Sequence, residues 1–399
     1  TDLRRRAASP DAQAPLPMGR ARFALSGGWT GQALFFAYLD RALPGRGYDE
    51  TAVDLLERAF DELGRADAQP GLYAGFTGLA WTVEHLRGWL VDEEDDPAGE
   101  IAERLARLLG ARPWPLEYDL ISGLVGFGLH ALERLPLPPA REAAERAVAR
   151  LGDLAERGTA GTSWWTEHAV MPEEMRMGEG AGHYNLGVAH GVPGILGWLG
   201  QACAAGVETA RPLLVTAVPW LLAHQNPPHL ASRFSSFFSP GQEWEPSRLA
   251  WCYGDLGIAV ALMTAARGAG ERDWERAALE IARAAAARPM ERADVSDPGL
   301  CHGAAGNLHL FNRLYQATGE PELAAAARVW LHRLLDMRQP GAGLGGFLVL
   351  LPDEHQQRAW RADPGFLTGS AGIGLALLAA ATPVEPAWDR LLLASAREA

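Results

Sequence analysis

The sequence contains no lysine, and its 36 basic residues are all arginines. We interpret this bias as codon usage in a GC-rich bacterial genome, which carries little functional information. Acidic residues outnumber basic ones, 49 to 36, and the formal net charge is -13. Nucleic-acid binding needs clustered positive charge against phosphate, so no nucleic-acid partner is expected. A cationic partner peptide fits this charge better.

Cysteine is also scarce, with three residues among 399. A secreted disulfide framework is therefore excluded, and a reducing, cytoplasmic location is predicted. No uninterrupted apolar run of 18 residues occurs, so no membrane span is expected. Residues 1–22 lack the apolar run of a signal peptide and are predicted to form a flexible N-terminal segment.

A pair of glycines three residues apart recurs seven times along the chain. Each pair is followed by an apolar run rich in small residues, which predicts a buried helix. The pairs are Gly28/Gly31, Gly75/Gly78, Gly123/Gly126, Gly191/Gly194, Gly254/Gly257, Gly303/Gly306 and Gly369/Gly372. Because glycine lacks Cβ, we expect it to allow positive φ and close backbone approach where each buried helix begins.

Segments between the pairs alternate apolar residues with Arg and Glu at helical spacing, which predicts amphipathic outer helices. Clear cases are residues 52–65, 99–109, 141–157, 274–288 and 322–338. Seven buried helices alternating with seven amphipathic ones predict an all-α fold, an α/α toroid formed as a double ring. We expect a single toroid domain over residues 23–399.

Three connections exceed normal loop length: residues 158–187, 224–250 and 339–366. Connections this long in a compact domain are usually functional or disordered. Their aromatic content, Trp164 and Trp360 included, favours ordered structure. Two interpretations stay open for them: walls of a groove, or satellite clusters packed on the helices.

Thiols and imidazoles occupy equivalent positions just before the first glycine in three consecutive repeats. They are Cys252 in repeat five, Cys301 and His302 in repeat six, and His190 in repeat four. Equivalent positions in a ring of helices lie at the same end, so these side chains can converge. Two thiolates and one imidazole suit a catalytic zinc site whose fourth position is open. Cys203, inside an apolar segment, is interpreted as an inert core residue.

The segments Trp251-Cys252-Tyr253-Gly254, Cys301-His302-Gly303 and Ala189-His190-Gly191, with the seven glycine pairs, resemble the lanthionine synthetase C-like (LanC) family. The resemblance covers nearly the whole chain from about Phe23. It implies an α/α toroid, one zinc ion held by Cys252, Cys301 and His302, and a stand-alone lanthipeptide cyclase. It also implies functional roles for four further residues: His190, Asp119, Arg248 and Tyr253.

The implied reaction adds a cysteine thiolate of a dehydrated precursor peptide across dehydroalanine or dehydrobutyrine and forms a thioether ring. Zinc deprotonates the thiol, and an acid must then protonate the α-carbon. His190 is the best candidate for this acid, and Asp119 can hold its ring. Arg248 can stabilise the enolate oxygen. For Asp119 and Arg248 the alternatives are a helix N-cap and a surface ion pair.

Other functions stay open at this point. Eukaryotic relatives in the family are thought to add glutathione to dehydrated protein residues. A non-catalytic toroid that binds a modified peptide, with zinc as a structural staple, is a second alternative. A glycosidase would need paired carboxylates, and none occurs in the repeat register. Because no dehydratase-like extension is present, a separate dehydratase and other biosynthetic enzymes are expected partners.

Overall fold

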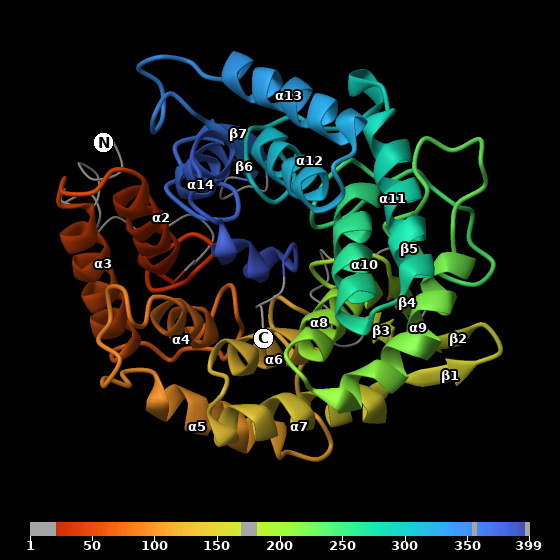
Figure 1. Cartoon of the computed structure of the whole chain (residues 1–399), viewed down its shortest axis with the longest axis horizontal. Helices are drawn as coiled ribbons and strands as arrows, with labels where there is room; N and C mark the ends of the chain where they lie inside the picture. Colours follow the sequence, from red (N-terminus) through yellow and green to blue (C-terminus); the bar gives the residue numbers. More distant parts are fainter. Residues whose placement is uncertain (1–20, 169–181, 353–356, 396–399) are drawn as a thin grey trace. The chain divides into compact units, whose positions relative to one another are not determined.

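The computed structural model describes residues 21–168, 182–352 and 357–395, and Figure 1 shows their elements. These residues form two compact units. Unit 1 contains the chain up to Leu108 together with Val295–Trp388, and unit 2 contains Leu109–Asp294 and the chain from Asp389 onward. Most of the predicted flexible segment, residues 1–22, lies outside the described residues. The expectation of one domain over residues 23–399 stays a prediction.

Unit 1 is mainly helical. Its α-helices are α2 (Trp29–Ala42), α3 (Tyr48–Leu63), α4 (Phe76–His85), α5 (Gly99–Leu109), α12 (Ala304–Thr318), α13 (Pro321–Asp336) and α14 (Ser370–Ala381). Helix α2 packs on α3 and α12 on α13, while α14 contacts both α2 and α12 (Figure 1). One antiparallel hairpin, β6 (Val349–Pro352) and β7 (Arg358–Arg361), precedes α14.

Unit 2 combines helices with two small antiparallel sheets. Its α-helices are α6 (Leu124–Glu133), α7 (Pro138–Leu154), α8 (Val192–Ala204), α9 (Arg211–Ala223), α10 (Asp255–Ala269) and α11 (Arg272–Ala286). Helix α8 packs against α6, α9 and α10, and α10 packs on α11. The strands are β1 (Glu156–Gly158), β2 (Gly161–Ser163), β3 (Trp165–Glu167), β4 (Gly182–Asn185) and β5 (Phe237–Phe238), paired β1-β2 and β3-β4-β5. Their shortness agrees with the weak strand signals of the sequence.

The first glycine of every pair is the N-cap of an α-helix, as predicted. These helices are α2, α4, α6, α8, α10, α12 and α14. Helix α8, for example, is buried at eleven consecutive positions from Val192 to Ala202, so no solvent-facing stripe exists along that stretch. This burial explains why the runs after the glycines are apolar all round rather than amphipathic.

The reason for glycine at these caps is close approach of backbones, and positive φ is needed at one cap alone. Six of the seven caps have extended backbone, and Gly254 is the exception with φ 127°. A Cβ on Gly75 would lie 2.1 Å from the carbonyl oxygen of Gln69, six residues earlier. The chain therefore folds back tightly just before each helix, and only a residue without Cβ fits there.

The predicted amphipathic helices are also present, as α3, α5, α7, α11 and α13. Helices α3, α7, α11 and α13 pack on glycine-capped helices. Charged side chains lie on the exposed faces, as the i, i+4 pair of Arg146 and Glu142 on α7 illustrates. Within the described residues, α14 is followed by a six-residue 3-10 helix, Ala387–Leu392, rather than by an α-helix. Pro383 and Pro386 stand between the two, and proline disrupts helical hydrogen bonding.

Gly75→Ala is expected to destabilise unit 1 by roughly 1–3 kcal/mol or more, because the added Cβ would overlap the Gln69 carbonyl. The matched control is Gly152→Ala in α7, where a Cβ meets nothing within 4 Å. That control should stabilise the protein by about 0.5–1 kcal/mol, since glycine is unfavourable in a helix interior. Urea denaturation at neutral pH measures both changes. Equal effects of the two variants would contradict the close-approach explanation.

The sheet β3-β4-β5 is built from two of the long connections, and aromatic side chains pack around it. Tyr184 of β4 contacts Trp165 of β3, Phe238 of β5 and Trp220 of α9, with ring centroids 4.8, 5.9 and 5.1 Å apart. These two connections are therefore ordered in their described parts, as their aromatic content predicted. Trp360 on the third connection is 54% exposed.

Two buried histidines lie side by side at this sheet. Nε2 of His168 is 3.2 Å from Nδ1 of His183, and His183 is 1% exposed. Burial, aided by the neighbouring His168, lowers the pKa of His183 from 6.5 to about 4. His183 is therefore neutral in the folded protein at pH 5, whereas it is protonated in the unfolded chain.

The folded state should thus lose stability as the pH falls below about 6.5. Between pH 8 and pH 5 the contribution of His183 to this loss is about 2 kcal/mol, because only the unfolded state takes up the proton. His183→Gln should make the pH dependence shallower by that amount, and His229→Gln, at an exposed position, should leave it unchanged. Urea denaturation at the two pH values measures the difference. An unchanged slope in His183→Gln would show that the histidine is already accessible to protons.

Candidate active site and metal centre

His190 and Asp119 form a hydrogen-bonded pair in unit 2. His190 directly precedes the cap of α8, and its Nδ1 lies 2.5 Å from Oδ2 of Asp119, which is 6% exposed. The other carboxylate oxygen of Asp119 accepts a hydrogen bond of 2.7 Å from the backbone N–H of Ser122. Asp119 therefore holds the turn before α6 and also orients the imidazole. The alternative of a helix N-cap is not realised by Asp119, because the N-cap of α6 is Gly123 and no side chain caps this helix.

The pKa of His190 is raised above its ordinary value of 6.5. Burial by itself lowers this pKa, but the hydrogen bond and the charge of Asp119 outweigh it, and the charges of Cys252 and Glu117 add to the rise. Burial and the charge of Asp119 in turn raise the pKa of Glu117. The raised pKa favours the protonated imidazole, which can donate a proton, more than in a free histidine.

Tyr253 lies beside His190, with ring centroids 6.3 Å apart and nearly parallel planes. Its hydroxyl oxygen accepts a hydrogen bond of 3.1 Å from Nδ2 of Asn185, a buried residue at the end of β4. The amide oxygen of Asn185 accepts a second bond, of 2.9 Å, from the backbone N–H of Gly187. Asn185 therefore connects the β4 strand to the aromatic ring next to the acid pair.

Arg248 stands six residues before Gly254, in the segment that folds back on α10. A Cβ on Gly254 would lie 2.0 Å from the carbonyl oxygen of Arg248, so this backbone contact requires glycine. The Arg248 side chain is partly exposed, and no carboxylate of the described residues forms an ion pair with it. The alternative of a surface ion pair is therefore not realised in the described part of the chain.

Cys252 also belongs to unit 2 and is 8% exposed. Its carbonyl oxygen accepts a hydrogen bond of 3.4 Å from the backbone N–H of Ala189. This bond joins the segment that carries Cys252 directly to the segment that carries His190. The repeat register thus places both side chains in neighbouring turns of the same unit.

Cys301 and His302 belong to unit 1, directly before the cap of α12. The backbone N–H of Cys301 donates a hydrogen bond of 2.7 Å to the carbonyl of Leu367, which occupies the same register position in the next repeat. Nε2 of His302 lies 3.5 Å from Oδ2 of Asp297, a carboxylate that is 3% exposed. The segment with Cys301 and His302 is therefore held by a backbone bond from the next repeat and by a side-chain contact within its own repeat.

Cys252, Cys301 and His302 form a group that can hold a metal ion, because each offers one ligand atom and these atoms lie within 4.8 Å of one another. No fourth histidine, cysteine, aspartate or glutamate of the described residues belongs to the group. Two thiolates and one imidazole are a borderline-soft donor set that suits zinc, and three protein ligands leave one tetrahedral position for another molecule. The residues present therefore fit the zinc site that the sequence predicted.

The structure thus groups the predicted site residues in two sets. Cys252, Cys301 and His302 make up the possible metal site, and His190 is joined to Asp119 and lies beside Tyr253. Among the described residues, the Arg248 side chain forms no hydrogen bond or ion pair with any of them. The catalytic roles assigned to these residues stay predictions.

The sequence did not identify Asn185 and Asp297, which contact site residues, or Glu117, whose charge helps to raise the pKa of His190. All three stand six residues before the first glycine of their repeat. Backbone atoms at or next to this position lie close to the capping glycine. Extending the repeat alignment from two residues to six upstream of the glycine would have found polar side chains there. What they contact depends on the fold and could not be read from this register alone.

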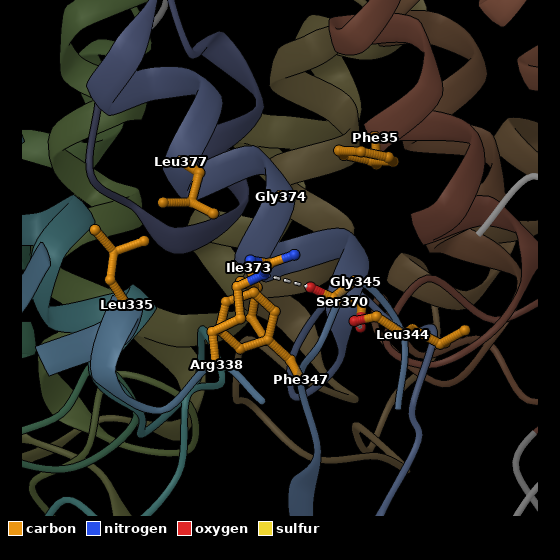
Figure 2. Close-up of a pocket in the computed structure, with 10 residues that line it drawn as sticks. All are labelled: Phe35, Leu335, Arg338, Leu344, Gly345, Phe347, Ser370, Ile373, Gly374 and Leu377. Atoms are coloured by element: carbon orange, nitrogen blue, oxygen red, sulfur yellow. Dashed lines mark hydrogen bonds between the residues drawn. The ribbon is translucent and has the colours of Figure 1, made fainter. Parts of the chain in front are cut away.

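The described residues also contain an apolar pocket of about 400 Å³ in unit 1, shown in Figure 2. Side chains of α2, α13 and α14 and the glycine-rich segment before β6 form its wall, among them Phe35, Phe347 and Leu377. Arg338 is its one titratable lining residue, and its Nε donates a hydrogen bond of 2.9 Å to the carbonyl of Gly345. The lining contains no carboxylic acid, imidazole or thiol, so this pocket is not the candidate active site.

The fold and the site define an all-α protein whose thiol, imidazole and carboxylate groups collect at the starts of glycine-capped helices. The family model described as "Lanthionine synthetase C-like protein" matches residues 20–393. The chain therefore belongs to the lanthionine synthetase C-like family, as the sequence motifs indicated.

The solved structure of nisin cyclase is similar over almost the whole chain. The match has a TM-score of 0.76 with 19% sequence identity, and it covers 98% of this chain and 96% of nisin cyclase. The predicted α/α-toroid fold class is thereby confirmed. A curated relative, Glutathione S-transferase LANCL1 of Danio rerio, is 30% identical over 139 residues. That match spans 34% of this chain and about a third, 32%, of the relative's length.

Among the described helices, none has the length and apolarity that a membrane span needs. The predicted cytoplasmic location stays a prediction.

Proposed function

We propose that this chain is a zinc-dependent lanthipeptide cyclase that forms the thioether bond of lanthionine or methyllanthionine. The observation that carries the proposal is the group of Cys252, Cys301 and His302, which can hold a metal with one position left open. Family membership and the similarity to nisin cyclase support it. The substrate class is a peptide that contains a cysteine and a dehydroalanine or dehydrobutyrine residue.

Cys252, Cys301 and His302 would hold the zinc ion. When bound, the zinc ion would supply Lewis acidity that lowers the pKa of a substrate thiol, which in a free cysteine lies near 8.5 and leaves little thiolate at neutral pH. The proton leaves to solvent, and the sulfur forms a bond to the β-carbon of the dehydro residue. The electron pair of the double bond moves toward the neighbouring carbonyl, so the product of this step is an enolate.

His190 completes the reaction by donating a proton to the α-carbon of this enolate. Its raised pKa favours the protonated form, and Asp119 stabilises the imidazolium through its hydrogen bond and charge. The neutral imidazole left behind regains a proton from solvent. One proton is therefore released and one taken up, and the peptide is isomerised with no net change in composition.

We assign to Arg248 and Tyr253 contacts with the substrate. Arg248 has no carboxylate partner among the described residues, so its guanidinium is available to the enolate oxygen or to a peptide carbonyl. Tyr253, held by Asn185 next to His190, provides an aromatic wall and a hydroxyl on the side of the proton donor. These two roles are less direct than those of His190 and the ligand group.

The test uses the purified full chain loaded with zinc and a panel of synthetic peptides, each with one cysteine and one dehydroalanine. Ring formation leaves the mass unchanged, so the assay measures loss of the free thiol by alkylation followed by mass spectrometry. We expect thiol loss to be faster with the zinc-loaded chain than with buffer or with the chelated chain. A rate equal to the uncatalysed one for every peptide would reject the cyclase assignment.

A second candidate is addition of glutathione to a dehydro residue, which uses the same metal and the same proton donor. The similarity to Glutathione S-transferase LANCL1 supports it. The same assay separates the two, because glutathione increases the peptide mass by one adduct whereas cyclisation does not. Glutathione offered together with a cysteine-containing dehydropeptide shows which thiol the enzyme uses. The expected result is ring formation without an adduct.

Dehydration of serine or threonine precedes this reaction, and we assign it to a separate enzyme. The chemistry of dehydration needs an activated hydroxyl, and the site residues found here are suited to a thiol and a proton instead. The assignment fails if the purified chain alone dehydrates serine or threonine in a precursor peptide.

A further inference from the structure

Asp297 is a buried carboxylate that the sequence motif did not include. It is 3% exposed, and its Oδ1 accepts a hydrogen bond of 2.8 Å from the backbone N–H of Gly299. Its own carbonyl oxygen accepts a bond of 3.0 Å from the N–H of Ala304, at the start of α12. Asp297 is therefore held through its side chain to the turn that follows it and through its backbone to the start of α12.

The remaining carboxylate oxygen, Oδ2, faces His302. Its distance to Nε2 of His302 is 3.5 Å, within the range of a charge interaction and slightly long for a hydrogen bond. Asp297 is not a member of the possible metal group, so it does not itself reach the ligand position. It contacts Nε2, and an imidazole that keeps a carboxylate at Nε2 can bind a metal only through Nδ1.

The same register contact recurs in the next repeat, where a threonine stands in the place of His302. Asp363 also stands six residues before its capping glycine, and its Oδ1 accepts a bond of 2.8 Å from the N–H of Gly365. Its Oδ2 accepts a bond of 2.6 Å from the hydroxyl of Thr368, at the position equivalent to His302. In both repeats an aspartate therefore contacts the side chain that directly precedes the capping glycine. In repeat six that side chain is the imidazole of His302.

We propose that Asp297 is the positioning residue of the metal centre, which fixes His302 with its proton on Nε2 and its lone pair on Nδ1. A neutral imidazole binds a metal through one nitrogen and donates a proton from the other, and a carboxylate acceptor fixes that choice. The negative charge also makes the ligating nitrogen more basic. This inference rests on the proposed zinc site and adds a residue to it.

Asp297→Asn tests the proposal with little change in shape. The N–H of Gly299 needs an acceptor, so the amide oxygen keeps the Oδ1 position and the NH₂ group takes the place of Oδ2. That group donates a hydrogen bond, so it favours the wrong tautomer, in which Nδ1 carries the proton and cannot bind a metal. Carboxylate partners of this kind typically contribute 10–100-fold to metal affinity.

The matched control is Asp363→Asn, which makes the same substitution at the same register position, next to Thr368 instead of His302. Both variants and the wild type are purified as full chains and freed of metal. Zinc affinity is then measured by competition with a chromophoric chelator. Thermal unfolding of the metal-free proteins reports the structural cost of each substitution, and the absorption of the Co²⁺-substituted proteins reports the ligand environment.

We expect Asp297→Asn to bind zinc 10–100-fold more weakly and to change the Co²⁺ spectrum, while Asp363→Asn keeps both properties of the wild type. Wild-type affinity in Asp297→Asn would overturn the proposal, and so would an equal loss in both variants, which indicates a merely structural role. Failure of the wild type to bind zinc at all would instead reject the proposed function. The two failures are therefore distinguishable.

Discussion

Cys301→Ala is expected to abolish stoichiometric zinc binding and to lower the rate of ring formation by about 10³-fold or more. Without the metal only about 3% of a substrate thiol with a pKa near 8.5 is ionised at pH 7, a loss of about 30-fold. A nucleophile that is no longer held in position costs about a further 10²-fold. Zinc content per chain and the thiol-alkylation assay measure the two effects.

Cys203→Ala is the matched control for this prediction. Cys203 is the remaining cysteine of the chain. It lies in α8 and is outside the possible metal group. Burial raises the pKa of its thiol to about 11, so it is neither a thiolate nor a ligand at neutral pH. Its substitution should change neither zinc content nor rate. Parallel losses in the two cysteine variants would indicate damage to the fold and not to a metal site.

The same variant separates a catalytic metal from a structural one. If zinc is only a staple, Cys301→Ala should lower the unfolding temperature strongly and lose peptide binding along with activity. We expect the unfolding temperature and peptide binding of Cys301→Ala to stay close to those of the wild type. Both ligand segments are already held by backbone bonds such as that from Cys301 to Leu367. Circular dichroism and binding of a dehydrated peptide, both on the purified variant, distinguish these outcomes.

The glycine register explains why so much of the fold was predictable. A residue without Cβ is needed wherever the chain folds back six residues before a helix, so Gly75 and its counterparts mark the helix starts directly in the sequence. The thiols and imidazoles one and two residues before those glycines then share a structural position. Local geometry alone therefore identified Cys252, Cys301 and His302 as candidates.

The residues that were missed depend on contacts that no local pattern encodes. Asn185 reaches Tyr253 because strand β4 pairs with strands β3 and β5, whose residues lie far away in the sequence. Strand pairing over such separations is set by packing, and short strands of two to four residues give almost no periodic signal.

The expected positive φ at the capping glycines was wrong at six of seven positions. Close approach requires glycine as strictly as a left-handed backbone does, and the sequence cannot tell the two apart.

His190→Gln is expected to lower the rate of ring formation by about 10²–10⁴-fold, the usual contribution of a positioned general acid. Glutamine cannot supply a proton to the α-carbon, yet it keeps a polar side chain at the start of α8. Zinc content should stay at the wild-type level, because His190 is outside the possible metal group. The control is His332→Gln on α13, an exposed position where no change is expected. Loss of zinc in His190→Gln would show that the histidine is a ligand and not the acid.

The pH dependence tests the role of Asp119 in the same step. His190 must be protonated to act as the acid, so the rate should fall as the pH rises through its raised pKa. In Asp119→Asn the imidazole loses the carboxylate that raises this pKa, while burial still lowers it. The smaller raising effects of the Cys252 and Glu117 charges remain, and so does the neighbouring ring of Tyr253. The alkaline fall of the rate should therefore move to lower pH in Asp119→Asn, with activity partly recovered below that point. A profile that keeps its midpoint would mean that another group donates the proton, since no other change in this variant raises the pKa of His190.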